Sequence, residues 1–148
     1  VTVRLEADKL DLALTGISDG KEVFFGALHV KASFAERRTD DVPMSEALVG
    51  AGFLSPLWTM DCKATPSARP VNKGELGRVW DPSADRRSAK RKDIEDDGYF
   101  SACFSYNRNT APTPNGQASI ANVYIADFSN PDDVFTQFVR AEWSKFSS

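Results

Sequence analysis

A charged segment poor in aliphatic residues, residues 69–97, divides the hydrophobic parts of this 148-residue chain. Its sequence, RPVNKGELGRVWDPSADRRSAKRKDIEDD, is interrupted by proline and glycine and is too polar to build a core. It is also longer than an ordinary connection inside a compact domain. We therefore expect residues 1–148 to form a single compact domain, with 69–97 as an exposed working surface or a mobile excursion.

The composition is that of an average globular protein and constrains the partners only weakly. Hydrophobic residues make up 41% of the chain, charged residues 26%, and the net charge at pH 7 is −3. Such mild acidity does not attract nucleic acid at long range, so binding would need a local basic patch. No apolar run is long enough for a membrane span, and VTVRLEAD shows no signal peptide. We expect no membrane partner and favour a cytoplasmic location.

Cys62 and Cys103 flank the polar segment and leave two interpretations open. Two cysteines are too few for a disulfide scaffold, which favours buried free thiols. A single bridge would instead close a loop around residues 69–97 and stabilise the fold by about 3–4 kcal/mol in the loop-entropy treatment.

Alternating apolar residues predict an antiparallel hairpin over residues 9–34. Apolar residues recur at every second position on both sides of the Ser-Asp-Gly turn signal at 18–20. Gly26 is expected to mark a bulge or a close backbone approach within the second strand. The same alternation places His29 and Lys31 on the polar face of that strand, which favours a solvated surface histidine.

A second hairpin is predicted over residues 99–128. YFSACFSY at 99–106 and ASIANVYIADF at 118–128 have the composition of strands. The loop 107–116 between them contains two prolines and ends in an Asn-Gly turn signal.

Two helices complete the prediction. A short helix is expected over residues 43–51, with Pro43 at its first position, and an apolar stripe predicts a C-terminal helix ending near Phe146, capped by Ser129 or Asn130. The predicted fold class is α+β and β-rich. Two antiparallel hairpins form a sheet or sandwich, with a short central helix, a long polar loop and an amphipathic C-terminal helix.

No catalytic constellation is evident in the sequence. His29 is the single histidine, and neither a phosphate-binding glycine loop nor a nucleophile elbow is found. Asp132 and Asp133 suit helix capping better than metal binding. We therefore expect no enzyme, no cofactor and no metal site. The favoured function is a non-enzymatic binding or assembly module, in which 69–97 and 107–116 contact another protein or further copies of the chain.

A basic run gives the main alternative, a single-stranded nucleic-acid-binding protein. RRSAKRK at 86–92 offers charge for a phosphate backbone, and nearby aromatic rings offer stacking surfaces for bases. The acidic DIEDD block follows at once, so the two blocks neutralise each other within a Debye length of about 8–10 Å. An enzyme and a carbohydrate-binding module are weaker alternatives. The candidate partner-binding residues are Arg86, Arg87, Lys90, Arg91, Lys92, Trp80, Tyr99 and Tyr106.

Overall fold

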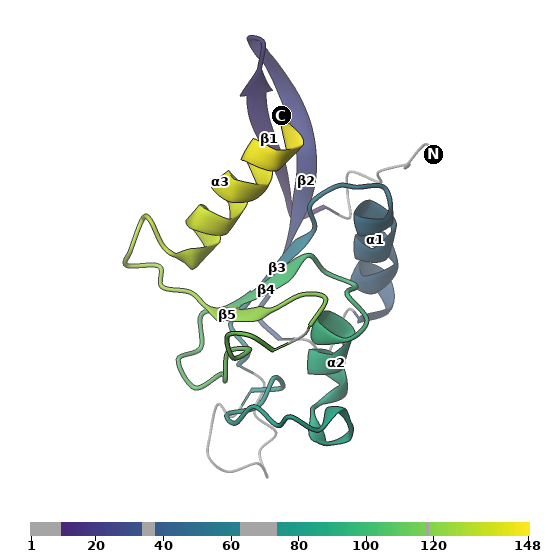
Figure 1. Cartoon of the computed structure of the whole chain (residues 1–148), viewed down its shortest axis with the longest axis vertical. Helices are drawn as coiled ribbons and strands as arrows, with labels where there is room; N and C mark the ends of the chain where they lie inside the picture. The colour runs from purple at the N-terminus through teal and green to yellow at the C-terminus, as the bar shows by residue number, and fades with distance from the viewer. Residues whose placement is uncertain (1–9, 34–37, 63–73, 118) are drawn as a thin grey trace.

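The computed structural model describes residues 10–33, 38–62, 74–117 and 119–148 as a mixed α/β structure (Figure 1). Five strands form one sheet in the order β1-β2-β3-β4-β5. β1 and β2 are antiparallel, and the other neighbouring strands are parallel. This arrangement is consistent with the expected α+β class. In chain order the elements are β1 (Leu12–Ser18), β2 (Lys21–Lys31), α1 (Arg38–Gly50), β3 (Pro56–Thr59), the 3-10 turn η2 (Ala84–Arg86), α2 (Ala89–Glu95), β4 (Ala102–Ser105), β5 (Val123–Ile125) and α3 (Val134–Phe146).

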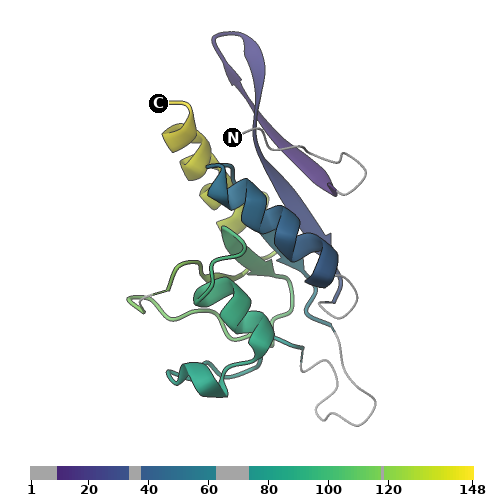
Figure 2. The same ribbon diagram turned by 90° about the vertical axis from the view of Figure 1, so that its right-hand side faces the viewer.

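Helices cover both faces of the sheet: α1 and α2 lie on one side and α3 on the other (Figures 1 and 2). Because side chains alternate along a strand, each central strand contributes to two cores. Leu57, Cys103 and Val123 face α1 and α2, where Ile94 joins them. On the opposite face, Trp58, Phe104 and Tyr124 pack against Val134, Phe135 and Phe138 of α3.

The first predicted hairpin is confirmed. β1 and β2 pair from Leu12 with Leu28 to Ser18 with Lys21, and the register shifts between Leu14 and Thr15. Gly26 lies where expected for a close approach, since a Cβ there would collide with the backbone carbonyl of Leu54. A hydrogen bond from the Leu54 amide to the Phe25 carbonyl, 2.8 Å long, joins the same stretch of β2 to the chain before β3.

The second predicted hairpin is wrong. β4 and β5 pair in parallel, from Cys103 with Val123 to Ser105 with Ile125. The Asn-Gly turn does form, with Gly116 at φ 79°, but it lies within the crossover rather than at a hairpin tip. All four residues of β4 are buried. Burial on both faces is typical of parallel strands, and their apolar runs do not reveal the direction of pairing.

The described part of segment 69–97 contributes to the core, against the expectation that it is too polar to do so. Leu76 is 1% exposed and Ile94 is 0% exposed, and both belong to the cluster under α1 and α2. The segment also buries the Arg91–Glu95 ion pair, and α2 forms where a long polar loop was expected, so that part of the prediction is wrong. Cys62 and Cys103 are free thiols, as favoured, but only Cys103 is buried.

Both predicted helices are present, but the predicted N-terminus of each is wrong. α1 begins at Arg38, so Pro43 lies inside it rather than at its first position. It ends in a Schellman-type turn, in which the amide of Phe53 donates to the carbonyl of Leu48. α3 is capped by the carboxylate of Asp133, which accepts from the Thr136 amide, and not by Ser129 or Asn130. Within the described ranges, no helix has the length and hydropathy needed to span a membrane.

Candidate active site

Two carboxylates converge on one ammonium group at the end of β2. The Nζ atom of Lys31 lies 3.2 Å from an oxygen of Asp11 and 3.2 Å from an oxygen of Asp41. The Lys31 side chain is 13% exposed, that of Asp41 12% and that of Asp11 31%. With all three groups ionised the cluster carries one net negative charge, and it remains in contact with solvent through Asp11.

Local structure brings these three residues together. Asp11 immediately precedes β1, and the antiparallel pairing of Leu12 with Leu28 places it beside the end of β2. The Val30 amide donates to the Asp11 carboxylate at 2.7 Å and fixes it there. Asp41 lies in the first turns of α1, whose start meets the end of β2 at the same edge of the sheet (Figure 2). This is the carboxyl edge of the parallel strands, where open α/β sheets bind their ligands.

His29 is fully buried behind this cluster, which corrects the expectation of a solvated surface histidine. It does share a strand face with Lys31, as predicted, but that face is covered by α1. Its Nε2 atom lies 2.9 Å from the Ser55 hydroxyl, and its Nδ1 atom lies 4.0 Å from a carboxylate oxygen of Asp41. The alternation was read correctly, but nothing in β2 alone indicates which helix covers it.

The surroundings shift the pKa values of two of these groups. Burial raises the pKa of Asp11, but the Val30 amide and the Lys31 ammonium outweigh burial, so the net pKa lies below its ordinary value. Burial lowers the pKa of His29, and the nearby Asp41 and Asp11 carboxylates offset only part of that effect. At neutral pH, Asp11 is therefore ionised and His29 is neutral.

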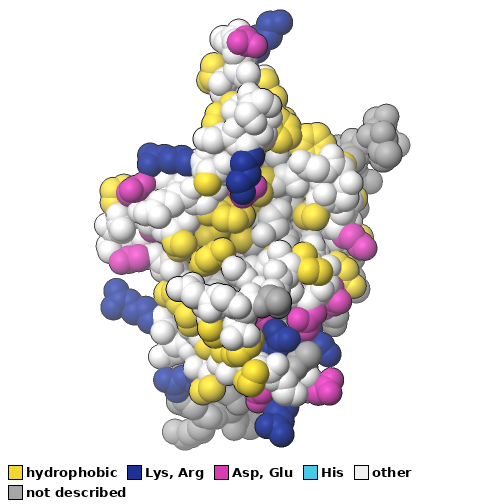
Figure 3. Space-filling view, viewed as in Figure 1, with side chains coloured by type: hydrophobic (Ala, Val, Ile, Leu, Met, Phe, Trp, Pro, Cys, Tyr) yellow, Lys and Arg dark blue, Asp and Glu magenta, His cyan; other side chains and the backbone are white. Residues whose placement is uncertain are grey.

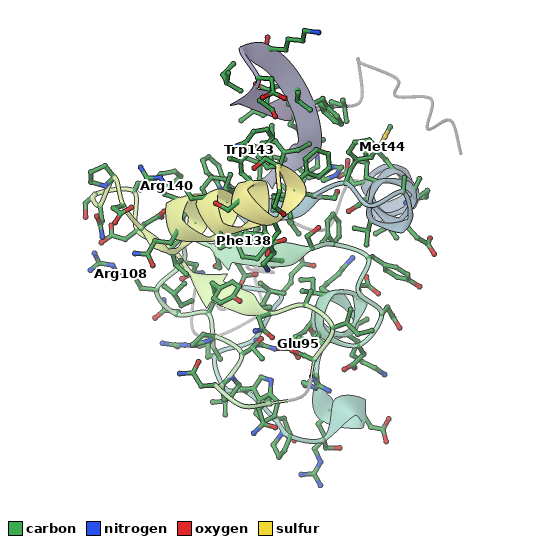
Figure 4. The ribbon with its side chains drawn as sticks, turned by 45° about the horizontal axis from the view of Figure 1, so that its top comes forward. Met44, Glu95, Arg108, Phe138, Arg140 and Trp143 are labelled. Atoms are coloured by element: carbon green, nitrogen blue, oxygen red, sulfur yellow. The ribbon has the colours of Figure 1, made fainter. Side chains whose placement is uncertain are left out.

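The predicted basic run is divided between solvent and core. Arg86 is exposed, and Arg87, Lys90 and Lys92 are half-buried. Arg91 is 1% exposed, and its Nε donates to Glu95 at 2.9 Å. Arg87 also pairs with Glu95 and with Asp96. The acidic block thus pairs directly with two residues of the basic run, and Glu95, the last residue of α2, is buried (Figure 4).

The aromatic residues proposed to stack on bases do not share one surface. The Trp80 ring lies under the Arg87 guanidinium, 5.6 Å from ring centroid to Cζ. Tyr99 packs on the core under α1 and α2. Tyr106 belongs to the opposite face, where it stacks on Phe128 with centroids 3.6 Å apart. The structure therefore brings Trp80 to the basic run but places Tyr106 across the sheet from Tyr99.

The loop 107–116 is held by a buried carboxylate at the same sheet edge. Asp61 is 1% exposed and accepts hydrogen bonds from the Thr110 hydroxyl at 2.7 Å and from the Glu75 amide at 2.6 Å. Burial raises the pKa of Asp61, partly offset by these hydrogen bonds. Arg108 remains exposed on this loop, and it projects outward on the same side of the view as Arg140 of α3 (Figure 4).

A cavity of about 520 Å³ lies away from these charged groups. It is lined by residues that precede β3, β4 and β5, by single residues of β2, α1 and β5, and by α3 from Phe138 to Phe146. In Figure 3 hydrophobic side chains gather in the middle of this face. The cavity adjoins the amino ends of the parallel strands, opposite the Lys31 cluster. The cavity is a weaker candidate for an active site than the Lys31 cluster, because its only charged lining residues in the described ranges are Glu142 and Lys145 of α3.

Asp11, Lys31 and Asp41 are not among the site residues predicted from the sequence. The sequence of β2 gave a partial signal for this site, because its last residues alternate between polar and apolar, with His29 and Lys31 as the polar ones. Asp11 also precedes the first strand of a hairpin that was predicted correctly. The hairpin register and the position of α1 were needed to join the three.

Comparisons with known proteins relate the chain to an enzyme. No family model matches it. The chain is similar to the type II restriction enzyme AgeI of Thalassovita gelatinovora, with 44% identity over 119 residues that cover 79% of this chain and 41% of that protein. It also resembles the crystal structure of the specific restriction endonuclease AgeI–DNA complex, with a TM-score of 0.78 and 38% identity, covering 94% of this chain and 51% of that one.

These similarities overturn the functional predictions made from the sequence. The prediction of a non-enzymatic binding or assembly module is wrong, and so is the prediction that no enzyme is involved, because both relatives are restriction endonucleases. The chain spans 41% of the curated relative and 51% of the solved one.

Proposed function

We propose that this chain carries the catalytic site of a DNA endonuclease that hydrolyses phosphodiester bonds. The observation that carries the proposal is the Lys31 ammonium, 3.2 Å from the carboxylates of both Asp11 and Asp41 at the carboxyl edge of the sheet. The similarity to a restriction endonuclease in complex with DNA supports the substrate class. We propose that this chain, which spans only part of its longer relatives, has DNA as both substrate and partner.

The two carboxylates fit a divalent cation such as Mg²⁺. Asp11 and Asp41 offer hard oxygen donors and already converge on one cationic group. Mg²⁺ is commonly held by one or two carboxylates together with substrate phosphates, without a complete protein cage. The described ranges contain no group of three or more His, Cys, Asp or Glu side chains that could hold a metal ion, so such a cation would rely on Asp11, Asp41 and the DNA phosphate. When bound, a divalent cation supplies Lewis-acid polarisation of the phosphate and an activated water.

Lys31 has the clearest role in the reaction. In hydrolysis the water oxygen bonds to phosphorus, the bond to the leaving sugar oxygen breaks, and a proton from the water ends on that oxygen. Negative charge grows on the phosphate oxygens as this occurs. A preorganised ammonium group next to them stabilises that charge. Asp11 and Asp41 hold the Lys31 side chain in place at 3.2 Å each, so no reorganisation is needed.

DNA is the proposed partner, and the predicted basic residues remain candidates for contact. Arg86 is exposed, and Lys90 and Lys92 are half-buried, whereas Arg91 is committed to Glu95. Phosphate contacts position DNA without reading its sequence. Whether duplex or single-stranded DNA is bound is decided by comparing the two forms of one sequence in a salt titration.

The test is cleavage of plasmid DNA by the purified chain with and without Mg²⁺. We expect cleavage that requires the divalent cation. Lys31→Ala and Asp11→Asn are expected to lower the rate by at least about 100-fold, the size seen when one charge-stabilising donor is removed.

Lys21→Ala is the matched control, because Lys21 is an exposed lysine at the opposite end of the same strand. It should leave cleavage unchanged. A parent chain that binds DNA but does not cleave it with any divalent cation would contradict the proposal, as would a Lys31→Ala variant that cleaves at the parent rate.

A further inference from the structure

A chain of buried polar groups runs from α1 through Ser55, the residue before β3, to the imidazole of His29. The Ser45 hydroxyl lies 2.7 Å from the Ser55 hydroxyl, which lies 2.9 Å from Nε2 of His29. Ser45, Ser55 and His29 are all 0% exposed. The backbone amide of Ser55 is held by the hydroxyl of Ser101 at 2.8 Å, which fixes the middle of the chain.

The other ring nitrogen of His29 faces Asp41. Its Nδ1 is buried and has no hydrogen-bond partner, and the nearest acidic oxygen is Oδ1 of Asp41 at 4.0 Å. The remaining carboxylate oxygen of Asp41 is the one that faces Lys31 at 3.2 Å. Asp41 therefore has one oxygen toward the ammonium group and one toward the imidazole.

Only one direction of proton donation suits all of these groups. If Nε2 carried the proton, the lone pair of Nδ1 would face the carboxylate of Asp41, which is unfavourable in a buried site. If Nδ1 carries it, Nε2 accepts from Ser55, and Ser55 in turn accepts from Ser45. The donors then all point the same way, and the last of them, Nδ1–H, faces the Asp41 carboxylate across 4.0 Å.

Helix geometry closes this chain into a ring. Asp41 and Ser45 are four residues apart on α1, so they lie on one face of the helix. One reaches toward Nδ1 of His29, and the other reaches toward Nε2 through Ser55. The imidazole thus faces α1 directly at Asp41 and is linked to Ser45 of the same helix through Ser55.

We infer that His29 is a positioning residue: its Nδ1–H group orients the carboxylate of Asp41 toward Lys31 and the DNA phosphate. This inference rests on the proposed endonuclease function, because Asp41 matters only if the cluster is the active site. His29 itself touches neither substrate nor reacting atoms.

The first test measures the tautomer of His29 and does not depend on activity. His29 is the single histidine of the chain, so its two ring nitrogens can be assigned directly by two-bond proton–nitrogen correlation spectra. We expect a neutral ring protonated at Nδ1, and a change in the Nδ1 shift in Asp41→Asn. A neutral ring protonated at Nε2 would overturn the inference.

The second test compares two amide substitutions in the cleavage assay. In His29→Asn the amide lies near the position of Nδ1, and in His29→Gln it lies near that of Nε2. If contact with Asp41 is what matters, His29→Asn keeps most of the rate, and His29→Gln loses about 10–100-fold in kcat with little change in KM for DNA. Thermal unfolding of both variants separates this from simple destabilisation.

Two outcomes of the cleavage assay would contradict the positioning role of His29 without contradicting the endonuclease function. Equal losses in the two variants, or a loss confined to His29→Asn, would mean that the Ser55 side dominates and that the role is structural. Ser45→Ala should change kcat less than His29→Gln, because it removes the far end of the chain. A parent chain that does not cleave DNA contradicts the proposed function instead, and the tautomer measurement still decides the inference.

Discussion

Two ionic clusters in this fold have opposite charge patterns. In the first, the ammonium group of Lys31 is shared by the carboxylates of Asp11 and Asp41. In the second, the carboxylate of Glu95 is shared by the guanidinium groups of Arg87 and Arg91. Glu95 is 0% exposed, whereas Asp11 is 31% exposed.

The difference between the clusters lies in what their remaining hydrogen-bonding groups do. Glu95 also accepts from the Thr113 hydroxyl at 2.7 Å, and Arg91 donates to the Leu76 carbonyl at 3.0 Å, so this cluster joins three separate segments. In the Lys31 cluster, two carboxylates share a single ammonium group near solvent, which leaves net negative charge for a cation. The Glu95 cluster, which is buried at Glu95 and Arg91 and reaches the surface at Asp96, holds the fold together. A cluster that is open at the edge of a sheet is available for chemistry.

The largest stability effect is expected from opening the Glu95 cluster. Arg91→Met removes one partner of a buried carboxylate, which typically costs about 3–5 kcal/mol. Urea unfolding should show this loss. Lys90→Met is the control, since Lys90 is a half-buried residue of the same helix. A loss of unfolding free energy below about 1 kcal/mol would show that the Glu95 cluster does not stabilise the fold more than an exposed ion pair does.

A large effect on activity, with little on folding, is expected from the Lys31 cluster. Asp41→Asn keeps the size of the side chain but removes its charge, and we expect cleavage to fall by at least about 100-fold. The unfolding free energy should change far less than in Arg91→Met. Asp132→Asn is the control, because Asp132 pairs with Arg140 on the exposed side of α3. If Asp41→Asn unfolds the chain as readily as Arg91→Met does, the Lys31 cluster is structural as well.

A smaller effect, the dependence of the unfolding free energy on pH, also distinguishes the two clusters. Because burial lowers the pKa of His29, the unfolded chain binds a proton more readily than the folded chain below about pH 6.5. Stability should therefore fall as the pH drops from about 7 toward 5, by at most about 1.4 kcal/mol per pH unit. The lowered pKa of Asp11 acts only below about pH 4, where its stabilisation is lost.

The measurement is urea unfolding across that pH range for the parent and His29→Gln. The substitution should flatten the slope, because glutamine does not titrate. Arg91→Met should keep the slope of stability against pH. Arginine stays charged over this range, so the substitution removes no titrating group. An unchanged slope in His29→Gln would assign the pH dependence to another group.

The smallest effect is expected from an exposed ion pair that serves as a baseline. Arg140 and Asp132 lie 2.7 Å apart, but their side chains are 72% and 61% exposed. Arg140→Ala should change the unfolding free energy by less than about 1 kcal/mol, because solvent screens such pairs. A larger change would mean that the surface charge of α3 contributes more than its exposure suggests.

Local signals explain which parts of the fold could be predicted. The hairpin of β1 and β2 follows from alternation around an Asp-Gly turn, and α3 follows from its apolar spacing. Both depend on residues close in the sequence. The parallel pairing of β4 with β5 was missed because an apolar strand buried on both faces carries no sign of its direction.

The sequence by itself determined the β1–β2 hairpin, the presence of α1 and α3, and the alternation that puts His29 and Lys31 on one face of β2. Only the tertiary structure decided that α1 covers that face, which buries His29 and brings Asp41 to Lys31. It also decided that the basic run, the most visible charge feature of the sequence, partly closes on Glu95 within the core. The physical reason is that charge in a sequence records only composition. Its use depends on which opposite charge lies a few ångströms away and on how much water reaches the pair.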